Sequence, residues 1–195
     1  MSEKSASYLD KLFGLEGRTA VVTGGNRGIG QVVARGLASA GAEVVVISRS
    51  GGAETVKLIL EDGNKAYDIK ADVTDEKSVD RAVEEIEKRS GGIHVLFNNA
   101  GICIHKSTFE ASIEEFRQVV DVNLTGEYIM ARSAARLMVQ KKIHGSIINM
   151  ASMSGTIVNI PQWQASYNAS KAGVIHLTKS LALEWIPYGL SLIHI

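Results

Sequence analysis

The sequence predicts an α/β fold, a doubly wound parallel sheet with helices on both faces. Short β-branched runs alternate along the chain with longer stretches whose apolar residues recur at helical spacing. The run Val44-Val45-Val46-Ile47 is continuously apolar, which is typical of a strand buried on both faces of a parallel sheet. With 195 residues, two prolines and no Ser/Gly-rich linker, the chain is expected to form one domain over residues 1–195.

The first half of the chain is expected to contain three strand–helix pairs. In the first pair, Ile29, Val33 and Leu37 place apolar side chains on one face of the helix, and Gly41 ends it. The expected strands cover residues 19–23, 43–48 and 65–70, and the expected helices cover residues 28–40, 53–61 and 75–90.

The second half continues the alternation with longer helices. The expected strands cover residues 94–97 and 146–150, and the expected helices cover residues 112–140, interrupted near Gly126, and 165–186, stopped by Pro187 and Gly189. Parallel strands joined through helices have right-handed crossovers, and their ligands bind beyond the carboxyl ends of the strands. The residues that directly follow each strand are therefore the candidates for a site.

Composition excludes several classes of partner. Lysine plus arginine equals aspartate plus glutamate, so no nucleic acid or anionic membrane is expected as a partner. No apolar run is long enough to span a bilayer, and residues 1–13 do not resemble a signal peptide. The single cysteine, Cys103, cannot form an internal disulfide, and the five histidines show no ligand spacing. We expect a cytoplasmic protein without a catalytic metal.

A glycine-rich segment, Thr23-Gly24-Gly25-Asn26-Arg27-Gly28-Ile29-Gly30, joins the first strand to its helix. Gly24 allows a sharp turn, Gly28 allows backbone to approach a pyrophosphate, and Gly30 allows close packing of helix on strand. The helix N-terminus offers unpaired N–H groups to phosphates. A glycine triplet can also mark only a turn, but at this junction it predicts dinucleotide binding of the Rossmann type. The expected cofactor contacts here are Thr23, Gly24, Asn26, Arg27, Gly28, Ile29 and Gly30.

The second strand ends in Ser48-Arg49-Ser50, a position that normally faces the adenosine ribose. An acidic residue there would favour NAD, whereas an arginine suits a 2′-phosphate. Arg27 is a second candidate for the same phosphate, and no competing acid is expected nearby. The alternative is that both arginines are merely exposed. The sequence therefore favours NADP(H), with Ser48, Arg49 and Ser50 as further cofactor contacts.

Five motifs occur together in one order along nearly the whole chain. They are Thr23–Gly30, Asn98-Asn99-Ala100-Gly101, Asn123, Ser152 and Tyr167-Asn168-Ala169-Ser170-Lys171. Each alone has an ordinary structural explanation: a strand-end cap, a helix kink, a turn, or an amphipathic helical pair. As a set they resemble the short-chain dehydrogenase/reductase family. The resemblance implies cofactor contacts from Asn98, Asn99, Ala100, Gly101, Tyr167 and Lys171, and from Asp72 and Val73 beside the adenine. Asp72 could instead cap the following helix.

The catalytic residues implied by the resemblance are Asn123, Ser152, Tyr167 and Lys171. Tyr167 and Lys171 are four residues apart on an expected helix and therefore share one face. A free tyrosine, with a pKa of about 10, is a poor base, but a nearby ammonium stabilises its phenolate. Tyr167 can then exchange a proton with a substrate oxygen, which Ser152 hydrogen-bonds. Ser154 is a rival for the serine role, and the resemblance implies that Asn123 anchors a water.

Residues 150–155 and 157–162 resemble a fungal-type subgroup that includes NADP-dependent mannitol 2-dehydrogenase, sorbose reductase and L-xylulose reductase. The resemblance implies interconversion of a ketose and its polyol; from the residues alone, only a small carbonyl or alcohol substrate follows, and a general carbonyl reductase stays open. The family also implies a homotetramer, and after Leu190 a further strand, a Pro-Gly loop, a lid-like helix and a last strand. Because the sequence ends at residues 191–195, we expect a truncated chain, and a fragment that only binds dinucleotide is the second alternative.

Overall fold

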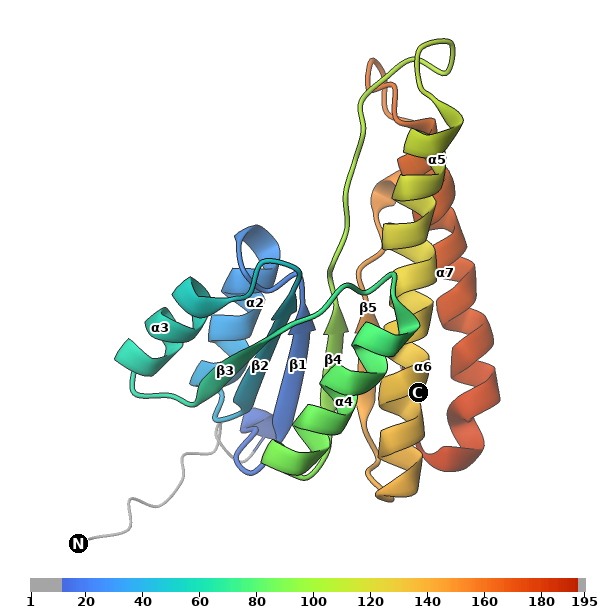
Figure 1. Ribbon diagram of the computed structural model, residues 1–195. Helices are drawn as coiled ribbons and strands as arrows, with labels where there is room; N and C mark the ends of the chain where they lie inside the picture. Colours follow the sequence, from blue (N-terminus) through green and yellow to red (C-terminus); the bar gives the residue numbers. More distant parts are fainter. Residues whose placement is uncertain (1–11, 193–195) are drawn as a thin grey trace, which may run out of the picture.

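The sheet has five parallel strands in the order β3-β2-β1-β4-β5, which confirms the predicted fold class. The computed structural model describes residues 12–192 (Figure 1). The expectation that residues 1–13 are not a signal peptide and the expectation for the chain end at residues 191–195 fall largely outside this range. The strands are β1 (Thr19–Thr23), β2 (Glu43–Ser48), β3 (Ala66–Lys70), β4 (Val95–Asn98) and β5 (Ser146–Asn149).

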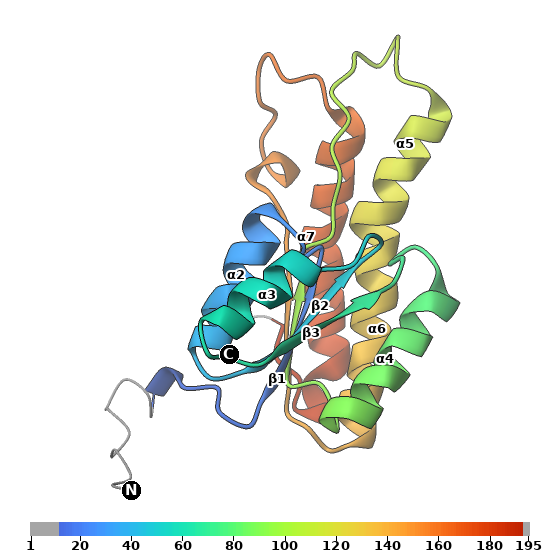
Figure 2. The same ribbon diagram turned by 60° about the vertical axis from the view of Figure 1, so that its left-hand side comes forward.

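Two apolar clusters cover the two faces of the sheet. Along β1, Val22 faces a cluster with α2 and α3, and Val21 faces a cluster with α4, α6 and α7. Successive strand side chains point to opposite faces, so a continuously apolar strand is buried twice. Figures 1 and 2 show the two helix layers on either side of the sheet. The helices are α2 (Gly28–Ser39), α3 (Ala53–Glu61), α4 (Glu76–Ser90), α5 (Ile113–Val120), α6 (Gly126–Gln140) and α7 (Ala165–Trp185).

The helix boundaries follow local signals in the sequence. Asp75 caps α4, because its side chain accepts a hydrogen bond from the Lys77 backbone N–H at 3.0 Å. Ser112 and Glu115 form a reciprocal capping box at the start of α5. After α7, the chain makes one short 3₁₀ turn around Pro187 and leaves it through a left-handed glycine.

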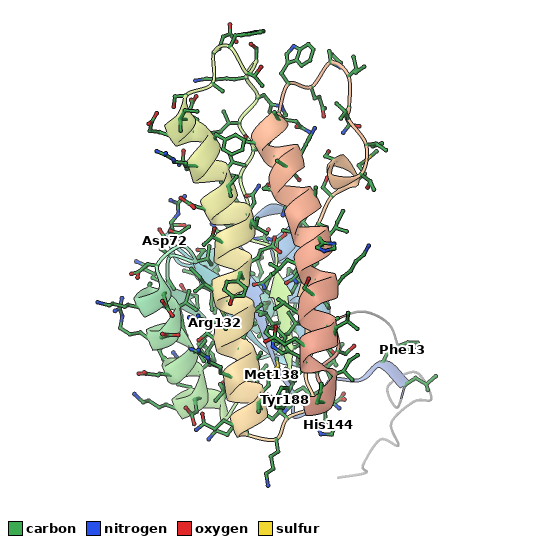
Figure 3. All side chains as sticks on the ribbon, turned by 90° about the vertical axis from the view of Figure 1, so that its right-hand side faces the viewer. Phe13, Asp72, Arg132, Met138, His144 and Tyr188 are labelled. Atoms are coloured by element: carbon green, nitrogen blue, oxygen red, sulfur yellow. The ribbon has the colours of Figure 1, made fainter. Side chains whose placement is uncertain are left out.

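The expected interruption of the long helix is a π-helical turn. Residues Asp121–Thr125 (η1) join α5 to α6 without a break, so the predicted helix over 112–140 is one rod with a wider turn in its middle. Gly126 follows this turn, and a Cβ there would lie 2.8 Å from Val73 Cγ2. Figure 3 shows the rod beside α7, and Arg132 of α6 pairs with Glu76 of α4.

The carboxyl ends of all five strands point to the same edge of the sheet. β1 lies between β2 and β4, so the connections leave this edge in opposite directions on the two sides of β1. The loops before α5 and before α7 rise beyond this edge (Figure 1). On the outer side of β5, Ser191 makes one parallel bridge to Ser146. In residues 12–192, no helix is long and apolar enough to cross a membrane.

Candidate active site

A cleft of about 840 Å³ opens beyond the carboxyl ends of the strands. Its wall runs from the glycine-rich segment, past the ends of β2, β3 and β4, to α7. The predicted site residues that line it are Gly24, Asn26, Arg27, Gly28, Ile29, Ser48, Arg49, Ser50, Asp72, Val73, Asn99, Ala100, Gly101, Ser152, Tyr167 and Lys171. Four predicted residues lie outside this lining: Thr23, Gly30, Asn98 and Asn123.

The glycine-rich segment has the backbone that only glycine adopts easily. Gly24 and Gly28 have φ angles of +62° and +57°, in the left-handed region. A Cβ on Gly28 would meet nothing within 4 Å, so its backbone faces open space. A Cβ on Gly30 would lie 2.4 Å from the Gly24 carbonyl oxygen, so helix and loop touch there. The α2 N-terminus is thus brought against the start of the loop.

Thr23 and Asn99 fasten β1 to the segment after β4. The Thr23 hydroxyl accepts hydrogen bonds from the backbone N–H groups of Asn99 and Ala100, at 2.9 and 3.0 Å. The Asn99 amide donates to the carbonyl oxygens of Thr23 and Gly24. Thr23 therefore shapes the cleft from behind its wall.

Asn98 is buried and hydrogen-bonds interior groups, and it does not line the cleft. Its amide donates to the Glu127 carbonyl oxygen and to Asn149 Oδ1, at 3.2 and 3.0 Å. Of the two asparagines in Asn98-Asn99, only the second reaches the cleft, because β4 ends between them and successive side chains of a strand point to opposite faces.

The two arginines expected at the adenosine end both line the cleft and are exposed. The loop and the end of β2 are in contact, since the Asn26 amide donates to Ser50 Oγ at 3.4 Å. For Arg49, the expectation that no acid lies nearby is wrong, because Asp72 is close enough for the Arg49 charge to lower its pKa. β3 runs beside β2, so their carboxyl ends meet, a contact the separate motifs did not reveal.

Asp72 closes a turn and does not cap α4. Its Oδ1 accepts hydrogen bonds from the backbone N–H and the hydroxyl of Thr74, at 2.9 and 2.7 Å. Burial raises the pKa of Asp72, but these hydrogen bonds and the Arg49 charge outweigh burial and lower the pKa overall. Asp72 lies near the upper end of α4 in Figure 3. The residue that caps α4 is Asp75 and not Asp72.

Ser152 and Ser154 differ in how their hydroxyl groups are used. The Ser152 hydroxyl accepts one backbone N–H, from Ser154, and lies half-buried in the cleft wall beside Tyr167 and Lys171. The Ser154 hydroxyl is buried and accepts hydrogen bonds from the amides of Asn159 and Gln164. Ser154 therefore organises the loop that precedes α7.

Asn123 lies in the π-helical turn and is fully buried. Its Oδ1 accepts the Ile102 N–H at 2.8 Å, and its amide donates to the Ile102 carbonyl and to Ser170 Oγ. The side chain thus ties the segment after β4 to α7. The helix irregularity that the sequence offered as one explanation is present at Asn123, whereas its role in holding a water stays a prediction.

Lys171 is 2% exposed and reaches the cleft only with part of its side chain. Its ammonium lies 3.0 Å from Glu127 Oε1 and also donates to the Met150 carbonyl oxygen. Burial raises the pKa of Glu127 to about 7, against the lowering effect of Lys171. Glu127 was not among the expected site residues. The available signal was its spacing, because positions 127, 130, 131 and 134 share the buried face of α6.

A second set of unexpected lining residues carries amides and a thiol. Gln164 is buried, its amide donates to Asn168 and Ser154, and its Oε1 accepts from Cys103 Sγ at 3.4 Å. Asn159 and Gln162 line the same end of the cleft. The sequence suggested only a larger turn over residues 158–162, because no motif marks these amides. Within residues 12–192, no three His, Cys, Asp or Glu side chains gather as a metal site.

The parallel sheet with a cleft beyond its strand ends defines a Rossmann-type α/β domain, and comparison with known proteins identifies its family. The family model for the short chain dehydrogenase matches residues 18–195, and the chain belongs to this family. This membership confirms the resemblance stated from the motifs.

Two curated relatives and one solved structure illustrate the similarity. Sorbose reductase SOU1 of Candida albicans is 41% identical over 91% of this chain and 64% of its own length. The NADP-dependent mannitol dehydrogenase of Alternaria alternata is 39% identical over 95% of this chain and 71% of its own. A solved short-chain type dehydrogenase/reductase from Mycobacterium marinum has a TM-score of 0.91 and 41% identity, covering 94% of this chain and 73% of that one. The chain thus spans about two thirds of the length of these proteins.

Proposed function

We propose that this protein is an NADP(H)-dependent oxidoreductase that interconverts a ketose and its polyol, with Tyr167 as the acid/base. The observation that carries the proposal is one cleft that is lined both by Tyr167, Ser152 and Lys171 and by the glycine-rich segment. A dinucleotide bound at the α2 N-terminus would extend along this cleft toward α7.

The residues present fit a dinucleotide. The backbone of Gly28 faces open space at a helix N-terminus, where a side chain would otherwise stand between the N–H groups and a phosphate. Arg27 and Arg49 are exposed cations beside the ribose position, which supports the 2′-phosphate of NADP. Asp72 opposes this preference, because its charge acts on Arg49. The Alternaria relative is an NADP-dependent enzyme by name, which supports the same choice.

The bound nicotinamide supplies the hydride. In the direction of reduction, the Tyr167 hydroxyl donates its proton to the substrate oxygen, and in oxidation the phenolate accepts it. Ser152, whose hydroxyl proton is not engaged by the Ser154 N–H, hydrogen-bonds the same oxygen. The Lys171 ammonium stabilises the Tyr167 phenolate and holds the nicotinamide ribose. Asn123 fixes the turn at which a relay water is held.

A polyhydroxylated substrate is supported by the end of the cleft near Tyr167. Asn159 and Gln162 offer amide groups there, which can donate to and accept from sugar hydroxyls. Sorbose reductase and mannitol dehydrogenase among the relatives support the same class. A homotetramer stays a prediction from the family resemblance, and a cytoplasmic location stays a prediction from the sequence.

The test is oxidation of NADPH with sorbose, fructose and xylulose, beside binding of NADPH measured by quenching of tryptophan fluorescence. We expect turnover with at least one ketose, and Tyr167→Phe is expected to abolish turnover while binding persists. Tyr188→Phe, at an exposed tyrosine beyond the other end of α7, is the matched control. Turnover retained in Tyr167→Phe would refute the assignment. Activity on diketones or quinones alone would identify a general carbonyl reductase, and binding without turnover a fragment.

A further inference from the structure

Glu127 is a carboxylate in the interior of the protein, on the face of α6 that packs against the sheet. It is 2% exposed, and Met130, Ala131 and Ala134 share its face. A carboxylate in such a place costs stability unless it is paired and hydrogen-bonded. Its one charged partner is Lys171, the lysine of the proposed active site.

The contacts of Lys171 account for two of its three N–H donors. One bonds Glu127 Oε1, and one bonds the Met150 carbonyl oxygen at the end of β5. These two acceptors come from different elements, so they fix the ammonium in position and orientation. Among residues 12–192, the third donor has no hydrogen-bond partner, and Lys171 lines the cleft. The arrangement presents one N–H of a fixed ammonium to whatever occupies the cleft.

We propose that Glu127 is a positioning residue: its carboxylate anchors the Lys171 ammonium so that the remaining N–H donor meets the ribose of the bound NADP(H). The proposal rests on the proposed function for the identity of that ligand. Glu127 does not touch the ligand, because its carboxylate lies behind Lys171 and outside the cleft lining. Its effect on binding passes through the ammonium.

The anchor depends on the negative charge of Glu127, and that charge depends on pH in the neutral range. Burial raises the pKa of the Glu127 carboxyl to about 7. Among the described residues, Glu127 Oε2 and Asn98 Oδ1 are buried acceptors without a hydrogen-bond partner, so no second donor holds the carboxylate ionised.

Apart from Lys171, the described groups around Glu127 are neutral. Lys171 on α7 is the charged group that acts on the carboxyl. Asn98 on β4 contacts the Glu127 backbone and bonds Asn149 on β5, and both are amides. A pH effect on the anchor therefore comes from Glu127 and Lys171 together.

The experiment measures the dissociation constant of NADPH against pH in wild type, E127Q, E127D and the control E184Q, which alters an exposed glutamate of α7. At a pH about one unit above 7, we expect E127Q to bind roughly fivefold to tenfold more weakly than wild type. At a pH about one unit below 7, wild type carries a protonated Glu127 and the two are expected to converge. E127D is expected to restore part of the NADPH affinity that E127Q loses at the higher pH, and E184Q is expected to behave as wild type.

The proposal is overturned if the ratio of the E127Q to the wild-type dissociation constant is the same at both pH values, or if the two proteins bind NADPH equally at the higher pH. Other titrating groups, including the NADPH 2′-phosphate with its pKa of about 6, also make the dissociation constant depend on pH. Their effect is the same in both proteins and cancels in the ratio. If E127Q does not fold, E127D carries the test: its shorter carboxylate is expected to weaken binding more than about twofold at the higher pH, and wild-type affinity at every pH would refute the anchor.

Failure of the proposed function has a different signature. If NADPH binding shows the pH-dependent difference between wild type and E127Q but no ketose is turned over, the result counts against the proposed reaction and not against the anchor. If wild type does not bind NADPH, the anchor is tested by carbon NMR titration of the Glu127 carboxyl. Its midpoint should rise by at least about one unit in Lys171→Met, and an unmoved midpoint overturns the proposal.

Discussion

Gly30 is the position at which the first turn of α2 touches the loop that precedes it. A Cβ there would lie 2.4 Å from the Gly24 carbonyl oxygen and 2.6 Å from Asn99 Nδ2. Neither neighbour is a flexible side-chain end with room to move, since one is backbone and the other bonds the Thr23 and Gly24 carbonyls. Gly30→Ala therefore forces apart the contact that shapes the cleft.

The size of the effect follows from these contacts. Overpacking by one methyl group costs about 1–3 kcal/mol. Loss of the two Asn99 hydrogen bonds adds about 1–3 kcal/mol at roughly 0.5–1.5 kcal/mol each. We expect Gly30→Ala to lower the free energy of unfolding by about 2–6 kcal/mol and to weaken NADPH binding, because Gly24 and Asn99 both line the cleft.

Urea denaturation followed by circular dichroism measures the effect, with Gly36→Ala as the matched control on the same helix. A Cβ on Gly36 would meet nothing within 4 Å, and its backbone is helical, so Gly36→Ala is expected to stabilise by about 0.5–1 kcal/mol. The reasoning is refuted if Gly30→Ala unfolds within about 0.5 kcal/mol of wild type.

Three further predictions concern charges and caps. Arg49→Asp should shift the ratio of NADPH to NADH affinity toward NADH by at least about tenfold, and an unchanged ratio would exclude Arg49 as the phosphate ligand. Asp75→Ala should lower the free energy of unfolding by about 1 kcal/mol, because the Lys77 N–H loses its acceptor, while Asp75→Asn keeps the cap; equal losses would contradict this role. The pKa of Glu127 is raised from 4.5 to about 7, so the folded protein keeps the Glu127 proton to a higher pH than the unfolded chain does. The resulting stabilisation is complete below pH 4.5 and is lost as the pH rises through 7. It amounts to roughly 3 kcal/mol, and urea unfolding at several pH values should show this slope in wild type and not in E127Q.

The elements and most of the cleft were predictable because their signals are local. Glycine spacing, apolar runs and capping residues act within a few positions, so the α3 bounds and the β1 bounds agree with expectation. The long helix was expected to be interrupted near Gly126, and the structure has a π-helical turn just before it. The nature of that turn depends on Asn123, whose partners are distant in the chain.

The missed features all arise between elements. Asp72 lies near Arg49 because β3 pairs with β2 in parallel, and Glu127 meets Lys171 because α6 and α7 pack on the same face of the sheet. Asn98 and Asn99 are adjacent in sequence, yet only Asn99 lines the cleft, since β4 ends between them. Such contacts join residues 20 or more positions apart, and single motifs do not encode them.

By itself, the sequence determined the alternation of strands and helices, the family, and the residue types that the proposed chemistry needs. These depend on hydrophobic periodicity and on glycines whose backbone requirements are local. The tertiary structure alone decided which predicted residues face the cleft, which fasten its walls, and which carboxylate lies behind Lys171. The physical reason is burial: the charge of Glu127 and the position of the Lys171 ammonium follow from an interior that exists only once α6, α7 and the sheet have packed together.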